Sequence, residues 1–186
     1  MRLDAATQSA MMKAVPELRA FAVALCHSAD QADDLVQEAL VHAIRRIDSF
    51  TPGTNMTAWL FTILRNHFYN EFRKHRREVS DSDGYFVGTL TSQPEQDGSM
   101  QLADFRKAFA MLPDDQREAV SLVGGAGLSY KEAAEVCHCP VGTIKSRANR
   151  GRALLAQLMS VESADDLGPD RALQAALSGG NLCWAA

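Results

Sequence analysis

The chain has 186 residues, of which 46% are hydrophobic and 23% are charged, and this length suits one larger domain or two small ones. These proportions exclude collagen-like, wholly disordered and coiled-coil proteins. The longest apolar run, residues 20–26, is much shorter than the roughly 18 residues of a membrane span, and no export signal is seen near Met1. We therefore expect a cytoplasmic protein with no membrane segment.

The cysteines and histidines offer no catalytic or metal-binding constellation. Without an export signal, unevenly spaced cysteines are expected to be thiols. The run Cys137-His138-Cys139 looks like half of a zinc site, but structural zinc sites add a second pair of ligands, and none is visible. No histidine has a partner Ser or Cys in a recognisable catalytic motif. The sequence therefore predicts a protein that is not an enzyme and that binds no metal or other cofactor.

The formal net charge of −4 is distributed unevenly along the chain. Residues 1–80 and 102–160 carry net charges of +1 and +2, whereas the segments between and after them carry −4 and −3. Two basic clusters lie within the cationic parts, at residues 65–77 and 145–152. Such clusters predict contact with nucleic acid, although a solvated helix face produces the same pattern.

Composition divides the chain into two helical parts, a linker and a tail. Residues 81–101 are acidic and rich in Gly, Ser and Thr without a helical period, which is typical of a linker. We therefore expect an all-α fold, with small helical domains at residues 1–80 and 102–160 joined by this flexible linker. Residues 161–186 form an acidic, Ala-rich tail whose function the sequence does not reveal.

Three helices are predicted in the first domain, over residues 16–27, 30–47 and 56–77. Pro16 suits the first position of a helix, and Asp30 suits an N-cap. The strong turn Thr51-Pro52-Gly53-Thr54 precedes the third helix. The apolar side predicted for the second helix consists of Leu35, Val36, Ala39, Leu40, Ala43, Ile44 and Ile47. The core stripe predicted for the third helix consists of Met56, Trp59, Leu60, Ile63 and Leu64.

The other faces of the second and third helices carry candidate contacts. With about 100° between successive residues, one face of the second helix comprises Asp34, Gln37, Glu38, Val41 and Arg45. A polar and basic face of the third helix comprises Thr62, Arg65, Asn66, Tyr69, Arg73 and Arg76. A cationic face with an aromatic in its middle can pair with phosphates and stack Tyr69 on a base. The alternative is that Tyr69 packs at the edge of the domain.

The second domain begins with two predicted helices, over residues 102–112 and 114–123. The run Gly124-Gly125-Ala126-Gly127 is expected to end the second of them, because glycine readily takes the left-handed conformation found past a helix C-terminus. The spacing of these glycines matches neither a P-loop nor a dinucleotide-binding motif, so no phosphate cradle is expected.

A helix-turn-helix is predicted after these glycines. Ser129 can cap a short helix over residues 130–136, a tight turn occupies residues 137–140, and a longer basic helix begins near Val141. The seam predicted to be buried is Val141, Ile144, Ala148, Gly151, Leu155 and Leu158. Residues that point away from this seam or flank it are Thr143, Lys145, Ser146, Arg147, Asn149 and Arg150. The second helix of such a motif reads base edges in the major groove, whereas in a simple αα-hairpin the charges only solubilise the helix.

Two long stretches of the chain match the pattern of a known family. The first is ADDLVQEALVHAIRRIDSFTPGTNMTAWLFTILRNHFYNEFRKHRR, and the second is LPDDQREAV…LSYKEAAEV…PVGTIKSRANRGRALL. They resemble the second and fourth conserved regions of the ECF sigma factors, in the family's order and over most of residues 10–160. Within that family, MTAWLFTILRNHFYNEFRKHRREVSDSDG is most similar to the EcfG type.

The resemblance implies an RNA polymerase sigma factor, with region 2 at residues 1–80 and region 4 at residues 102–160. EcfG-type factors direct the general stress response, and an anti-sigma factor of NepR type restrains them. NepR is in turn titrated by the response regulator PhyR, whose own sigma-like domain mimics the sigma factor. The implied partners are core RNA polymerase, promoter DNA in its double-stranded and single-stranded forms, and a NepR-type anti-sigma factor.

The resemblance also implies roles for individual residues. The clamp helices of core polymerase would dock on Asp34, Gln37, Glu38, Val41 and Arg45. The loop Phe50–Thr57 and the start of the third helix would capture a flipped base of the non-template strand at the minus-ten element. The implied minus-ten contacts are Phe50, Asn55, Trp59, Thr62, Arg65, Asn66, Tyr69, Arg73, Arg76 and Arg77. The implied minus-thirty-five contacts are Thr143, Lys145, Ser146, Arg147, Asn149 and Arg150.

One residue departs from the family pattern, because His138 stands where members commonly have glycine in the turn. Residues other than glycine are uncommon in the left-handed conformation, but histidine is among those better tolerated.

Two other functions fit parts of the chain. A sigma mimic that only binds an anti-sigma factor needs no basic clusters, and an ordinary helix-turn-helix regulator leaves the long basic helix of residues 56–77 without a role.

Overall fold

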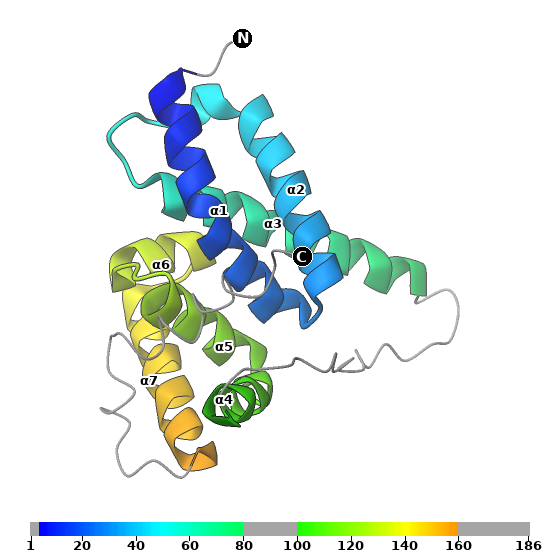
Figure 1. Ribbon diagram of the computed structural model, residues 1–186, viewed down its shortest axis with the longest axis vertical. Coiled ribbons are helices and arrows are strands. Elements are labelled where there is room, and N and C mark those ends of the chain that lie inside the picture. Colours follow the sequence, from blue (N-terminus) through cyan, green and yellow to red (C-terminus); the bar gives the residue numbers. More distant parts are fainter. Residues whose placement is uncertain (1–3, 80–99, 160–186) are drawn as a thin grey trace. The chain divides into compact units, whose positions relative to one another are not determined.

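The computed structural model describes residues 4–79 and 100–159, and all the regular elements in these two ranges are helical (Figure 1). The chain divides into two compact units, Met1–Ser92 and Gln93–Ala186. The predicted all-α fold of two small helical domains is therefore confirmed. The predicted linker (residues 81–101) and tail (residues 161–186) lie outside the described residues, apart from the start of the first helix of the second unit.

The first helix, α1 (Ala5–Cys26), begins eleven residues before the predicted start at Pro16. Its N-cap is Asp4, whose carboxylate accepts the backbone N–H of Thr7 at 2.8 Å. Pro16 therefore lies inside the helix, where it was wrongly expected to begin one. The helix continues across this proline because Met11 and Ala14 are buried, and their burial offsets the missing hydrogen bond.

The second helix, α2 (Ala29–Arg45), is capped by Ser28 rather than by the predicted Asp30, which lies in the first turn. The Ser28 hydroxyl accepts the N–H of Gln31 at 3.4 Å. A short 3₁₀ helix, η1 (Ile47–Ser49), follows. Of the predicted apolar side, Leu35, Val36, Ala39 and Ala43 are buried. Ile44 is 44% exposed, so its assignment to the core was wrong.

The third helix, α3 (Met56–Val79), packs against α1 and α2, as Figure 1 shows. The side-chain oxygen of Asn55 accepts the N–H of Ala58 at 3.2 Å and so caps the helix. Met56, Leu60 and Leu64 are buried as predicted, whereas Trp59 and Ile63 are only partly buried. The core instead includes Phe61, which the predicted stripe missed and whose ring meets that of Phe21 edge-on at 4.9 Å.

The second unit opens with α4 (Met100–Ala110) and α5 (Asp114–Val120). The chain then forms a single π-helical turn, η2 (Ser121–Gly125), where the continuation of an α-helix to Val123 was predicted. Gly127 has the positive φ expected past a helix end, at 67°.

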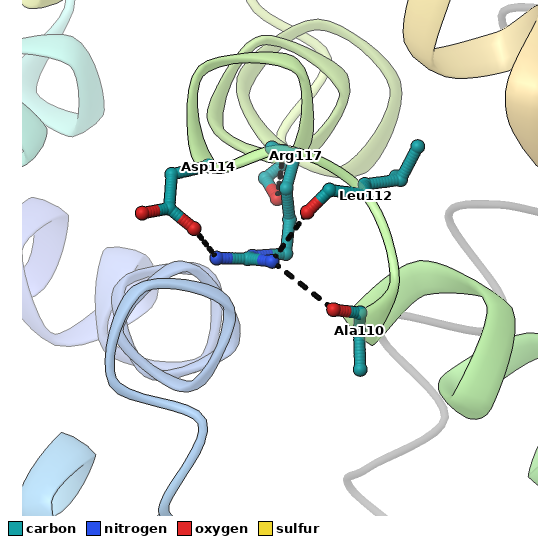
Figure 2. Close-up of polar contacts among 5 residues, drawn as sticks. Ala110, Leu112, Asp114 and Arg117 are labelled. Atoms are coloured by element: carbon teal, nitrogen blue, oxygen red, sulfur yellow. Dashed lines mark hydrogen bonds and ion pairs between the residues drawn. The ribbon is translucent and has the colours of Figure 1, made fainter. Parts of the chain in front are cut away.

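A buried arginine ties the start of α5 to the chain before it (Figure 2). The Arg117 guanidinium donates to the carbonyl oxygens of Leu112 at 2.8 Å and Ala110 at 3.4 Å, and to the Asp114 carboxylate at 2.5 Å. Only 4% of the Arg117 side chain is exposed. These donors satisfy carbonyl groups left without a helical partner at the end of α4, so the charge can be buried.

The predicted helix-turn-helix is confirmed by α6 (Tyr130–Cys137) and α7 (Val141–Leu158). Ser129 and Glu132 form a reciprocal capping box at the start of α6. His138 occupies the turn in the left-handed conformation, with φ 51°. Histidine thus adopts the backbone conformation for which glycine is common at this position. Four members of the predicted seam of α7, Ile144, Ala148, Gly151 and Leu155, are buried, and so is Ala156. The two end members of the predicted seam, Val141 and Leu158, are exposed.

Candidate polymerase and nucleic-acid interfaces

The candidate docking face on α2 is exposed throughout. Its members are Asp34, Gln37, Glu38, Val41 and Arg45. Ile44 extends this face with a second exposed apolar side chain beside Val41, which is 46% exposed. Sequence reasoning missed Ile44 because its spacing also fits the core side of the helix. The face therefore combines acidic, basic and apolar groups, as a protein docking surface does.

Glu38 is the residue that connects this face to α3. Its carboxylate contacts the ring Nε2 of His67, and the ring of His42 lies 5.2 Å from that of His67. Glu38 remains 60% exposed in this contact, whereas 16% of the His67 side chain is exposed. The contact therefore orients the Glu38 carboxylate while leaving it accessible to a partner.

An aromatic pair flanks the turn before α3, with one ring on each side of it in the sequence. The rings of Phe50 and Trp59 lie 5.3 Å apart, and both side chains are partly buried. The turn itself is closed by Thr54, whose hydroxyl donates to the Thr51 carbonyl at 2.7 Å. Gly53 has φ 89°, a conformation that other residues rarely adopt. The turn is thus locally ordered over residues 51–54 and brings Phe50 next to the first turn of α3.

The predicted basic face of α3 forms a connected set of contacts. The Arg65 guanidinium lies 4.6 Å from the ring centre of Tyr69. Arg73 donates to the Tyr69 carbonyl at 3.1 Å and to the Asn70 side chain at 3.0 Å. Tyr69 is partly buried, with its ring against Phe68 at 5.3 Å. The tyrosine therefore packs on its own helix and still presents part of its surface, so the two predicted alternatives are not exclusive.

The remaining members of this face differ in accessibility. Asn66 and Arg73 are exposed, and Thr62 is partly buried with its hydroxyl donating to the Ala58 carbonyl at 3.0 Å. The side chains of Arg76 and Arg77 lie outside the described residues. Phe72 is 58% exposed, and sequence reasoning missed it. Helical spacing could have identified Phe72, because it lies three residues after Tyr69 and therefore on the same side of the helix.

On α7, the six predicted contacts fall into two groups. Lys145, Asn149 and Arg150 are exposed, and Thr143 and Ser146 are partly buried on the same outward side. Arg147 differs from these five residues because its Nε lies 3.1 Å from the Oδ2 of Asp115 on α5. Asp115 was not among the predicted site residues. No local pattern links residues 32 positions apart, so only the packing of α5 on α7 reveals the pair.

The cysteines in the described ranges, Cys26, Cys137 and Cys139, are thiols that form no disulfide, as predicted. Burial raises the pKa of the Cys26 thiol to about 11. Within residues 4–79 and 100–159 no three His, Cys, Asp or Glu side chains are grouped closely enough to hold a metal ion. Among the same residues no helix has the length and apolar character needed to cross a membrane.

Comparison with known proteins identifies the family. Residues 11–78 match the model of Sigma-70 region 2, and residues 102–155 match that of Sigma-70 region 4. The chain is 54% identical to the ECF RNA polymerase sigma factor EcfG of Rhodopseudomonas palustris, over 91% of this chain and 93% of that protein. It is 38% identical to the ECF RNA polymerase sigma factor SigC of Mycobacterium tuberculosis, over 72% and 74% of the two chains.

Solved structures agree with these sequence matches. The sigma factor RpoE of Bartonella quintana, in complex with the anti-sigma factor NepR, is 49% identical and superposes with a TM-score of 0.76. That match covers 84% of this chain and 98% of the other. The resemblance predicted from the two long stretches is therefore confirmed. The chain belongs to the ECF family of RNA polymerase sigma factors.

Proposed function

We propose that this sigma factor docks on core RNA polymerase through α2, captures the minus-ten element with α3 and its preceding turn, and reads the minus-thirty-five element with α7. The promoters would be those of general stress response genes, and the protein would act in the cytoplasm with polymerase. Residues 1–80 and 102–160 would be the two functional domains. The strongest support is that family regions 2 and 4 occur in order, each with its exposed candidate face.

Docking on the polymerase would use the exposed face of α2. Glu38 supplies a carboxylate held by His67, and Val41 and Ile44 supply apolar surface. A basic partner helix with an apolar edge complements this combination of groups. Burial of the two aliphatic side chains would add affinity, and the carboxylates would select the orientation of the helix.

Opening of the minus-ten region would need no catalytic group. A protein that binds the separated strand more tightly than the duplex shifts the equilibrium toward strand separation, so the protein need not be an enzyme. The Phe50 and Trp59 rings and the Asn66 amide, with the cations of α3, offer stacking, hydrogen bonding and phosphate contact to a flipped base. Arg65, Arg73, Arg76 and Arg77 would hold the phosphates of that strand.

Reading of the minus-thirty-five element would use the outward side of α7. Lys145 and Arg150 can donate to guanine O6 and N7, and Asn149 can pair with adenine. Thr143 and Ser146 supply smaller donors close to the N-terminal end of the helix, which is the end that enters the groove. Arg147 differs from these residues because its guanidinium contacts Asp115 of α5.

A NepR-type anti-sigma factor would restrain this protein. The support is the 49% identity to the Bartonella quintana sigma factor that was solved in complex with NepR. A restraining partner of this kind would compete for the surfaces that core polymerase and DNA use.

Run-off transcription tests the proposal. Core RNA polymerase is given a panel of promoter templates with and without this protein, and new transcripts are expected only in its presence. Arg150→Ala should lose promoter selection while it still binds core polymerase. Lys107→Ala, which removes an exposed cation from α4, is the matched control and should transcribe normally. Absence of any protein-dependent transcript, with anti-sigma binding retained, would instead identify a sigma mimic.

A further inference from the structure

We infer that Asp115 of α5 is a positioning residue for promoter recognition, and that Arg147 serves the recognition helix through Asp115 rather than by contacting DNA. The inference rests on the proposed reading of DNA by α7. It reassigns Arg147, which its sequence spacing grouped with the DNA contacts, and it gives a role to Asp115.

The direction of the Arg147 side chain is the first observation. With about 100° between residues, Arg147 lies about 70° from the middle of the buried seam of α7, whereas Ser146 lies about 170° from it. The guanidinium reaches back to α5, where its Nε is 3.1 Å from the Asp115 Oδ2. The Arg147 side chain is 30% exposed, whereas Lys145 and Arg150 are exposed residues. Arg147 therefore points toward the helix interface and not toward the groove-facing side.

The closeness of α5 and α7 at this point is the second observation. A Cβ placed on Gly151, one turn after Arg147, would lie 2.7 Å from Val120 Cγ2 and 3.2 Å from the Gln116 carbonyl oxygen. The two helices thus meet at Gly151, and Asp115 precedes Gln116 in the same turn of α5. Ile144, Ala148 and Leu155 of the same buried seam also hold α7, through apolar contacts that are not directional. The Asp115–Arg147 pair adds a directional polar contact beside this seam, which restricts small rotations of α7 about its own axis.

Rotation of α7 matters because the groove-facing residues must keep their register with the bases. Lys145, Asn149 and Arg150 occupy one side of the helix over little more than one turn. A rotation of the helix displaces all three side chains from the base edges together, and the resulting longer or bent hydrogen bonds are weaker. The pair therefore affects promoter preference even though neither partner contacts a base.

The two roles of Arg147 predict opposite results for Asp115→Ala. If Arg147 acts through Asp115, this variant and Arg147→Ala should each lower the affinity for promoter DNA by about two- to fivefold, the range of an exposed ion pair, and the double variant should be no worse. If Arg147 binds phosphate, Asp115→Ala frees the guanidinium, and affinity should stay or rise.

The measurement is fluorescence anisotropy of holoenzyme, assembled from the full chain and core polymerase, on a labelled promoter duplex that the wild type transcribes. The charge-swapped variant, Asp115→Arg with Arg147→Asp, should restore promoter preference over a scrambled duplex. The slope of log affinity against log salt should be unchanged in Arg147→Ala, because loss of a phosphate contact would reduce it by about 0.9. A reduced slope, or an Asp115→Ala variant that binds as well as wild type, would overturn the inference.

Two controls separate this inference from the proposed function. Asp104→Ala removes an exposed acid from α4 without touching Arg147 and should leave promoter preference unchanged. Arg150→Ala should lose preference; if it does not, DNA reading by α7 itself is wrong, whatever Asp115→Ala does. Thermal unfolding of each variant confirms that the domain remains folded at the assay temperature.

Discussion

Gly151 of α7 lies so close to Val120 of α5 that a methyl group at position 151 would be 2.7 Å from the valine Cγ2. The Gln116 carbonyl oxygen, 3.2 Å from the same methyl position, limits the space further. Val120 is completely buried and β-branched, so it has little freedom to move aside. The packing of the helix-turn-helix on α5 therefore depends on the absence of a side chain at this residue.

Gly151→Ala should destabilise the second domain by about 1–3 kcal/mol, because the helices must separate to admit the methyl group. Gly142→Ala in the same helix is the matched control, since nothing lies within 4 Å of a Cβ there. That variant should be stabilised by about 0.4–1 kcal/mol through the lower entropy of its unfolded chain. Amide hydrogen exchange in α7 measures both changes. Equal effects of the two substitutions would contradict the close approach.

Arg117→Met should destabilise the second domain by about 2–3 kcal/mol, because it leaves the Leu112 and Ala110 carbonyls without their donors. Asp114→Asn, which retains an acceptor at an 85% exposed side chain, should cost no more than about 1 kcal/mol. Both free energies can be obtained from denaturant unfolding monitored by exchange of α5 amides. If Asp114→Asn costs as much as Arg117→Met, the ion pair and not the carbonyl contacts holds this turn together.

Glu38→Arg should weaken binding to core polymerase by about tenfold or more, because it reverses the charge at the centre of the proposed docking face. His67→Ala is the control, since it removes the contact between His67 and Glu38 but leaves the Glu38 carboxylate exposed on α2. This variant should retain most of the affinity in a pull-down titration with core polymerase. Equal loss in the two variants would show that Glu38 acts by fixing α2 against α3.

The Cys26 thiol should make the stability of the first domain depend on pH above about 9. Burial raises its pKa from 9.0 to about 11, so the folded state favours the neutral thiol. The contribution of the neutral Cys26 thiol to the free energy of unfolding is fully present below pH 9. It is lost as the pH rises toward 11, because in that range the thiol ionises readily only in the unfolded chain. Trp59 fluorescence during unfolding at pH 8 and pH 10.5 measures the difference. In Cys26→Ala the loss of stability between pH 8 and pH 10.5 should be smaller than in the wild type. The same loss in both proteins would contradict the role of Cys26.

Much of the local structure could be predicted from the sequence. The helix-turn-helix was predictable because Ser129, Glu132 and the residues of the turn act on their near neighbours, and caps and turns are decided over four or five residues. The start of α1 was not, because Pro16 is a strong local signal for a helix start that the burial of Met11 and Ala14 overrides. Ile44 was expected in the core and is exposed, whereas Phe61 was not expected there and is buried. Burial of a residue depends on which neighbouring helices cover its side, and the sequence pattern does not contain that information.

The family, the order of the helices and the basic faces of α3 and α7 can be derived from the amino-acid sequence, because helical periodicity and charge placement are properties of consecutive residues. Three contacts become visible only in the folded chain: Arg147 faces Asp115, His67 contacts Glu38, and Gly151 lies against Val120. Each of these contacts joins different helices. Their partners are set by the angle and distance at which the helices cross, and shape complementarity of whole faces decides those quantities.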